Sequence, residues 1–429
     1  MKKSTILLIL VALFAISCES PFEPKPDLEV ECEETEQPTP NLPTPNPPAQ
    51  AIEMPAALAS RTTQGNEFAF NLFYKILQTT NDKNVFISPL SVDFALGMTL
   101  NGANSVTRDE MKCVLRHSGL TSSQINEYYR IMFDALPTID PMTELNIANS
   151  IWCNKGFPVR QSFLDVNAKY FDAEIQNLDF SSPDALKTIN AWIAEHTNDL
   201  IEEALDEVDP DAAMYLINAI YFKGTWTTQF EKENTEKATF FAENGTQNQV
   251  YMMHIPRSTF LYYANAHAQF LDMSYGNGAF SMTVILPREG KALQDVVDNL
   301  SSGYFSDIVK NRLDSTNVTV YLPRFQMEYS ITLNDVLIAL GMPSAFCPRT
   351  ADFSGISCVR LYTSRVIHST FVEVNEEGTE AAAVTIWEGV PVSAEPPPRL
   401  TFRADRPFIF VIRENSTGAI LFMGKMGDI

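Results

Sequence analysis

The sequence is poor in the residues and motifs that build catalytic or metal centres. Only five histidines occur among its 429 residues, and none stands in an H-E-x-x-H frame: His117, His196, His254, His267 and His368. The chain has no G-x-S-x-G elbow and no Walker loop. We therefore expect a protein that is not an enzyme and that carries no cofactor.

Cysteine is also scarce. The six cysteines form no C-x-x-C pair and no cluster with histidine at metal-ligand spacing: Cys18, Cys32, Cys113, Cys153, Cys347 and Cys358. The usual zinc motifs are therefore excluded. Cys347 and Cys358 are the closest pair in the C-terminal part, but sequence alone does not establish the geometry that a disulfide needs, so all pairings stay open.

Positive charge and long apolar runs are lacking as well. Lysine and arginine number 31 against 53 aspartates and glutamates, which makes the formal net charge -22. Binding to phosphates needs a basic patch, so no nucleic-acid partner is expected. No apolar run reaches the roughly 20 residues of a membrane-spanning helix. A hydrophobic content of 45% still predicts a globular protein with a sizeable core.

The N-terminus has the pattern of an export signal. Lys2 and Lys3 precede an apolar stretch at residues 6–14, and small Ser17 comes directly before Cys18. We interpret residues 1–17 as a signal peptide. The segment resembles a bacterial lipoprotein signal, although Ala15 stands where leucine is usual. This implies acylation of Cys18 and a lipid anchor in the membrane, with cleavage without lipidation as the alternative.

Residues 18–60 are predicted to form a tether behind the acylated cysteine. The stretch from Glu19 to Pro55 holds 10 of the 26 prolines and nine acidic residues against one lysine. Such a segment buries too little apolar area to fold and stays extended. The expected location is the bacterial cell envelope, at the outer membrane or the cell surface, with release to the extracellular space as a further outcome.

Residues 61–429 are predicted to form one domain, because no Pro/Gly/Ser-rich break and no internal repeat divides them. Apolar residues recur at helical spacing in residues 68–76, 96–103 and 186–196. Strand-like runs occupy residues 214–222, 280–286, 318–322, 366–374 and 408–413. This irregular mixture indicates an α+β fold with a helix-rich first half and a strand-rich second half.

Two polar residues interrupt apolar runs, Asn218 within residues 216–222 and His368 within residues 366–371. We expect both to be buried, and buried polar groups need hydrogen-bond partners. A satisfied core position is the simplest interpretation of each residue. A structural latch is the alternative.

Several motifs of this domain resemble those of the serpin family, in the same order along the chain. They are NVFISPLS (84–91), NAIYFKGTW (218–226), LPRF (322–325), NEEGTE (375–380), LTFRADRPFIF (400–410) and GAILFMG (418–424). The resemblance covers nearly all of residues 61–429. It implies the serpin fold, with about three β-sheets, eight to nine helices and an exposed reactive-centre loop at about residues 376–398.

The resemblance also implies roles for single residues. The shutter, whose hydrogen bonds keep the main sheet closed until a new strand enters, is matched by Ser88, Ser91, Asn218 and His368. The breach at the top of that sheet is matched by Trp226 and Arg324, and Arg324 is expected to pair with Glu376.

The hinge of the loop is matched by Glu376, Glu377, Gly378, Thr379, Glu380, Ala381, Ala382 and Ala383. A loop that becomes a strand buries alternate side chains, and the inward set here begins with Thr379, Ala381 and Ala383. These side chains are small, and Gly378 supplies backbone freedom where strand turns into loop. The hinge therefore permits insertion.

An inhibitory serpin acts as a suicide substrate, since the cleaved loop inserts into the main sheet while the protease is still bound as an acyl-enzyme. Seventeen residues counted inclusively from Glu376 end at Val392, so the resemblance implies Val392-Ser393 as the scissile bond by the family's rule. The long stretch that follows leaves Ala394-Glu395 as the alternative. A small apolar residue at this position favours elastase-like serine proteases, with cysteine proteases as a further class.

The expected partners are thus a target protease and, through the lipid anchor, a membrane, and the protein is expected to be a monomer. Val384 and Trp387 lie in the path of insertion and favour an alternative, a non-inhibitory surface protein of serpin fold that binds a ligand or partner. A surface hydrolase is a third alternative. It is favoured only by the export signal and the tether.

Overall fold

The structure is a computed structural model, and the residues that it describes are 47–379 and 400–429. The signal peptide, Cys18, most of the tether and the loop from Glu380 to Arg399 lie outside these ranges. Contacts divide the chain into Met1–Pro45 and Asn46–Ile429, and all described helices and strands belong to the second unit.

Nine α-helices occur in the described residues, and the longer ones come first. The first six are α1 (Arg61–Thr79), α2 (Pro89–Leu100), α3 (Ser105–Val114), α4 (Ser122–Ala135), α5 (Gln161–Phe171) and α6 (Ala185–His196). The three later ones are α7 (Leu293–Asn299), α8 (Ser302–Asp307) and α9 (Asn334–Leu340). Short helical turns lie at Ala56–Leu58, Lys232–Asn234, Ile308–Arg312 and Pro343–Phe346.

Local sequence signals set several helix ends. The Ser88 hydroxyl accepts a hydrogen bond from the Ser91 N–H at 3.2 Å, and Pro89 occupies the first helical position of α2. Thr121 and Gln124 form a reciprocal capping box at the start of α4. These residues stop the backbone donors of the first turn from being left without partners.

The largest sheet runs in the order β1-β15-β14-β8-β7-β6-β9-β13, with β5 beside β6. Its strands are β1 (Val85–Ile87), β5 (Glu236–Phe241), β6 (Gln247–Ala264), β7 (Ala268–Tyr275), β8 (Phe280–Pro287), β9 (Asp314–Pro323), β13 (Leu400–Arg403), β14 (Phe408–Glu414) and β15 (Ile420–Met426). Strands β8 and β14 are buried along their whole length, which explains their nearly continuous apolar sequences.

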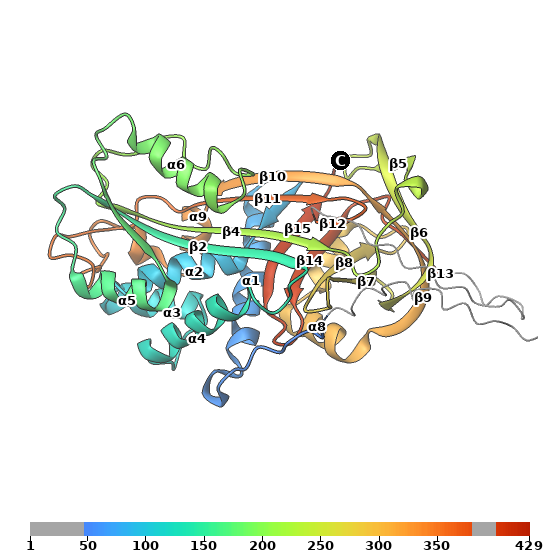
Figure 1. Cartoon of the computed structure of the whole chain (residues 1–429), viewed down its shortest axis with the longest axis horizontal. Coiled ribbons are helices and arrows are strands. Elements are labelled where there is room, and N and C mark those ends of the chain that lie inside the picture. The colour runs from blue at the N-terminus through green and yellow to red at the C-terminus, as the bar shows by residue number, and fades with distance from the viewer. Residues whose placement is uncertain (1–46, 380–399) are drawn as a thin grey trace, which may run out of the picture. The chain divides into compact units, whose positions relative to one another are not determined.

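Two smaller sheets lie next to each other (Figure 1). One has the order β12-β4-β2-β3, with β12 (Gly378–Thr379), β4 (Met214–Thr225), β2 (Thr143–Asn154) and β3 (Glu174–Leu178). The other pairs β10 (Phe325–Thr332) with β11 (Ile367–Val374). Within the described residues no backbone ladder joins β4 to β11, and we call the space between these two strands the slot.

Strand β2 shows how the layers are built. Leu145, Ile147 and Ile151 belong to the main core, whereas Trp152 belongs to a second apolar cluster and Ala148 packs against it. Because successive side chains of a strand point to opposite faces, β2 contributes to both clusters. Helix α6 supplies much of the second cluster and covers this face of β2 and β4 (Figure 1).

The predicted α+β class is confirmed, and the three sheets and nine helices found in residues 47–379 and 400–429 agree with the numbers implied by the resemblance. The folded unit begins earlier than the predicted boundary at Arg61. Ile52 and Leu58 are buried, and the Ile52 N–H donates to the Ser416 hydroxyl at 2.9 Å. Apolar residues at the end of the tether segment find partners on the domain, so this part of residues 18–60 is not a solvated tether.

The described residues also bear on disulfides, membrane-spanning helices and metal sites. Cys113, Cys153, Cys347 and Cys358 are free thiols, so no disulfide joins Cys347 to Cys358. Among residues 47–379 and 400–429, no helix is both long and apolar enough to cross a membrane. No group of three or more metal-ligating side chains occurs in the same ranges.

Candidate functional site

The site begins with a buried carboxylate at the end of β11. Glu376 is 1% exposed, and its Oε1 accepts hydrogen bonds from the Arg324 guanidinium and from the Thr235 hydroxyl at 2.7 Å. Burial alone would raise the pKa of Glu376, but these two hydrogen bonds, a backbone hydrogen bond and the positive charge of Arg324 together lower the pKa below its ordinary value. The structure thus brings together Arg324 and Glu376, the pair that the resemblance predicted.

Trp226 follows β4 directly and holds the next part of the chain. Its ring is 2% exposed and stacks on Tyr275 with centroids 4.3 Å apart. The indole N–H donates to the Asn375 carbonyl at 3.1 Å, and the backbone N–H donates to the Glu377 carbonyl at 2.9 Å. The backbone on both sides of Glu376 is therefore fixed to one buried residue, to the indole of Trp226 at Asn375 and to its backbone N–H at Glu377.

Gly378 allows the hinge backbone to join the sheet. It pairs with Thr225 of β4, and Thr379 pairs with Gly224. The φ angle of Gly378 is 151°, and a Cβ atom built on it would lie 2.1 Å from the Gly224 carbonyl oxygen. Only glycine fits such a close approach, so the first two strand residues of the hinge already lie beside β4.

The remaining hinge and loop predictions fall outside the described residues. They concern Glu380, Ala381, Ala382, Ala383, Val392, Ser393, Ala394 and Glu395. The structure describes the two residues that flank this segment. Thr379 ends β12 on its N-terminal side, and Leu400 begins β13 on its C-terminal side.

Three of the four predicted shutter residues lie together. The Ser88 N–H donates to His368 Nε2 at 2.9 Å, and the Ser88 hydroxyl donates to the Leu421 carbonyl at 2.8 Å while it accepts from Ser91. Burial lowers the pKa of His368 to about 4, so its ring is neutral at neutral pH and Nε2 is free to accept. This contact ties β11 to the start of α2.

Asn218 differs from the prediction. It is half-buried rather than buried, because β4 borders the slot and no strand pairs with that part of its edge. Its Nδ2 donates to Asn149 Oδ1 at 2.9 Å and to the Ala148 carbonyl at 3.4 Å, while its own Oδ1 has no partner. Asn218 therefore links β4 to β2, and it forms no hydrogen bond with His368.

Sequence reasoning missed several residues of this site. Thr235 and Lys232 contact the hinge glutamates, the lysine through an ion pair with Glu377. Asn149 is buried and donates from Nδ2 to the Phe171 carbonyl at 2.7 Å. Thr235 and Lys232 lie in a polar stretch and Asn149 in an alternating strand, so none of them interrupts an apolar run as Asn218 and His368 do.

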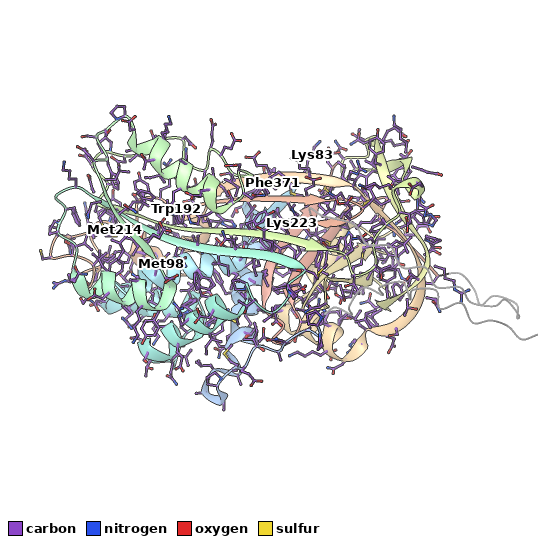
Figure 2. The ribbon with its side chains drawn as sticks, in the orientation of Figure 1. Lys83, Met98, Trp192, Met214, Lys223 and Phe371 are labelled. Atoms are coloured by element: carbon purple, nitrogen blue, oxygen red, sulfur yellow. The ribbon has the colours of Figure 1, made fainter. Side chains whose placement is uncertain are left out.

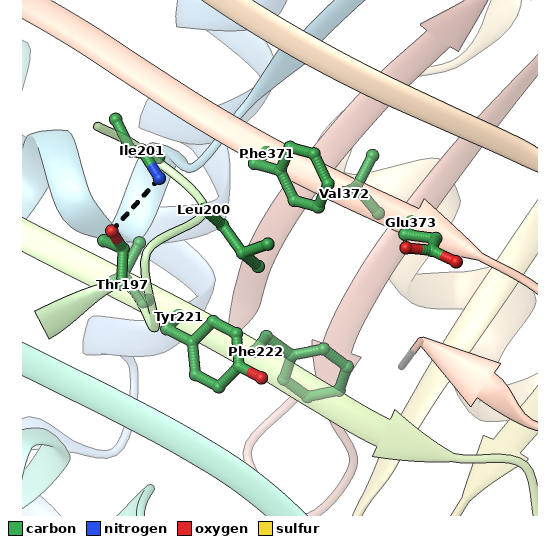
Figure 3. A pocket seen from close by; sticks show the side chains of 9 residues that line it. Thr197, Leu200, Ile201, Tyr221, Phe222, Phe371, Val372 and Glu373 are labelled. Carbon is green, nitrogen blue, oxygen red and sulfur yellow. Dashed lines mark hydrogen bonds between the residues drawn. The ribbon is translucent and has the colours of Figure 1, made fainter. Parts of the chain in front are cut away.

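The slot forms a hollow between β4 and β11 (Figure 3). Strand β4 contributes Ile220, Tyr221 and Phe222, and β11 contributes Phe371, Val372 and Glu373. Residues from the segment after α6 close it from one face: Thr197, Leu200 and Ile201. Figure 2 shows the two borders, with Lys223 on β4 and Phe371 on β11.

Comparisons with known proteins agree with this architecture. A family model described as serpin (serine protease inhibitor) matches residues 63–429. A serpin-like protein of Thermococcus kodakarensis is 37% identical over 368 residues, which cover 84% of each chain. Human neuroserpin is 34% identical over 372 residues, 84% of this chain and 90% of neuroserpin. The native state of tengpin, a thermophilic serpin, superposes with a TM-score of 0.78 at 33% identity and covers 90% of this chain and 97% of its own.

The fold and the family match together define the class, a serpin-type protease inhibitor fold. The chain belongs to the serpin family, and the predicted serpin fold is confirmed. Membership of this family supports protease inhibition in general, with a target protease as partner.

Proposed function

We propose that this chain is a suicide-substrate inhibitor of serine proteases, with elastase-like enzymes as the favoured targets and cysteine proteases as a further class. The observation that carries the proposal is the position of the hinge. Gly378 and Thr379 already pair with Thr225 and Gly224 at the end of β4. Strand β4 borders the slot, and it does not pair with β11, the other border strand.

The geometry supports a simple sequence of events. A protease cleaves the loop and stays joined to it as an acyl-enzyme. The freed loop then extends β12 along β4, and about 15 residues at about 3.4 Å each would span roughly 50 Å. New ladder hydrogen bonds to β4 and β11 and newly buried apolar area drive this step. The protease moves with the strand, and pulling on its acyl bond displaces the oxyanion from closely placed donors.

The direct test is adduct formation with neutrophil or pancreatic elastase. We expect an SDS-resistant complex and a released C-terminal fragment that begins at Ser393, or at Glu395 if the alternative bond is cut. The control is Thr379→Arg, because a charge on the inward face of the hinge opposes insertion and should convert the inhibitor into a substrate. Complete turnover of the wild-type loop without adduct, across a panel of serine and cysteine proteases, would contradict the proposal.

The second candidate is a non-inhibitory surface protein of serpin fold. Trp387 and Val384 in the insertion path favour it, and a structure of human thyroxine-binding globulin complexed with its ligand superposes with a TM-score of 0.78 at 28% identity. Loop cleavage separates the two candidates. An inhibitor should gain thermal stability when the cut loop inserts, whereas an unchanged melting temperature would favour the binding protein.

For the N-terminus we propose export and acylation at Cys18, which would anchor the protein in the bacterial cell envelope. The support is the pattern of residues 1–18, with small Ser17 before the cysteine. Labelling of growing cells with a tagged fatty acid should mark the wild-type protein and not the Cys18→Ser variant. A soluble, unlabelled wild-type protein would instead indicate cleavage without lipidation.

A further inference from the structure

A segment after α6 lies across the slot. Residues 197–208, which we call the crossing segment, follow α6 directly and close the hollow between β4 and β11 through Thr197, Leu200 and Ile201 (Figure 3). Ile201 and Leu205 are 6% and 7% exposed. A strand that fills the slot would put alternate side chains on this face, where the crossing segment now lies.

The apolar contacts of the crossing segment reach both borders of the slot. Ile201 and Leu205 belong to the second apolar cluster, which includes Trp192 of α6. Ile367 and Phe371 of β11 pack against the same cluster from the other side. The crossing segment thus bridges the two sheets that must be parted by an inserting strand.

The side chains of Asn190 in α6 and Thr197 in the crossing segment fasten the segment to the helix. Asn190 accepts from the Leu205 N–H at 3.0 Å and donates from Nδ2 to the Leu205 carbonyl at 2.9 Å. The Thr197 hydroxyl donates to the Ile193 carbonyl at 2.8 Å and accepts from the Ile201 N–H at 3.3 Å. These hydrogen bonds hold the helix and the segment together as one unit.

Several contacts hold this unit to the β4 side of the slot. The Trp192 indole donates to Glu174 of β3 at 3.0 Å, and Asn146 of β2 donates to the His196 carbonyl at 3.1 Å. The Asp209 N–H, just after the crossing segment, donates to the Tyr215 hydroxyl of β4 at 2.9 Å. These contacts come from three different strands of one sheet.

The β11 side is held by a weaker polar contact. Arg365, two residues before β11, lies 3.8 Å from the Glu207 carboxylate and donates to the Glu207 carbonyl at 3.5 Å. The two side chains are 29% and 75% exposed. In the part of the chain that the structure describes, Arg365 makes the polar contacts between the crossing segment and the β10–β11 sheet.

We propose that Arg365 is a positioning residue whose contact with Glu207 slows loop insertion. The inference rests on the proposed function. Because α6 and the crossing segment are held more firmly on the β4 side, they stay there when a strand inserts and lift away from β11. Breaking the Arg365–Glu207 contact is then part of the barrier, and an exposed ion pair makes that barrier sensitive to salt.

The test uses the full mature chain and a synthetic peptide with the sequence of residues 378–392, which should anneal into the slot without any protease. Annealing is followed by the gain in thermal stability. We expect Arg365→Gln to anneal about two- to fivefold faster than wild type, as an exposed ion pair permits. Lys310→Gln is the control, since it removes one exposed positive charge from the helical turn Ile308–Arg312. Glu207→Gln should have a smaller effect, because its carbonyl still binds Arg365.

Salt provides a readout that a purely structural role would not change. At about 1 M NaCl, where charges are screened beyond about 3 Å, the difference between wild type and Arg365→Gln should shrink. Equal annealing rates for Arg365→Gln, Lys310→Gln and wild type at low salt would overturn the proposed role of Arg365. This result would leave the proposed inhibitory function unaffected. If the peptide does not anneal to wild type and no protease adduct forms, the proposed function fails, and the inference fails with it.

Discussion

The contact between Ser88 and His368 predicts that acid lowers the free energy of unfolding. His368 Nε2 accepts from the Ser88 N–H, and a protonated ring has no lone pair for this hydrogen bond. The pKa of His368 is 6.5 in the unfolded chain, whereas burial lowers this pKa to about 4 in the folded chain. Between these values the unfolded state holds more protons, so stability falls as the pH drops through this window.

The loss in the free energy of unfolding follows from the two pKa values of His368. One pKa unit corresponds to about 1.4 kcal/mol, so complete protonation would cost roughly 3 kcal/mol, of which about 2 kcal/mol appears between pH 7 and pH 5. Urea unfolding followed by tryptophan fluorescence at these two pH values measures the loss. His117 is also buried, and burial lowers its pKa, so the total loss in wild type includes both residues.

A variant isolates the contribution of His368. Glutamine at this position keeps an acceptor for the Ser88 N–H and does not titrate, so His368→Gln should lose about 2 kcal/mol less than wild type between pH 7 and pH 5. His267→Gln is the control and should keep the wild-type dependence. The reasoning is refuted if His368→Gln and wild type lose the same stability over this range.

Further predictions concern the hinge and the breach. Gly378→Ala puts a Cβ against the Gly224 carbonyl oxygen, so it should unpair β12 from β4 and slow adduct formation at least tenfold. Stopped-flow kinetics with elastase measures the rate of adduct formation. An unchanged rate would contradict the role of the pairing. Glu376→Gln removes the charge that binds Arg324 and should lower stability by about 1–3 kcal/mol in urea unfolding, whereas an effect near zero would show that the pair is dispensable. Trp226→Ala empties a buried site against Tyr275 and should cost about 3–5 kcal/mol, while Trp226→Phe should restore part of it.

Much of the fold and part of the site could be predicted from the sequence. The predicted strand-like runs at residues 214–222 and 408–413 lie inside β4 and β14. These strands could be predicted because the spacing and type of apolar residues are local properties of the chain. Gly378 was expected at a place that demands backbone freedom, and its φ of 151° and its close approach to Gly224 fit that expectation. The burial of Ile52 and Leu58 was not predicted, because proline and acid content averaged over residues 18–60 hides a few apolar residues at its end.

The sequence was enough to assign the family, and it predicted a hinge of small residues, since both inferences depend on short motifs whose residue types have direct conformational consequences. The partners of the polar groups, by contrast, follow from the three-dimensional fold. Asn218 pairs with Asn149 across β4 and β2, Glu376 gains Thr235 as a second donor, and Arg365 reaches Glu207 from more than 150 residues away. The packing of strands that are distant in sequence selects these hydrogen-bond partners. Neither the spacing of apolar residues along the chain nor its composition shows which polar groups will meet.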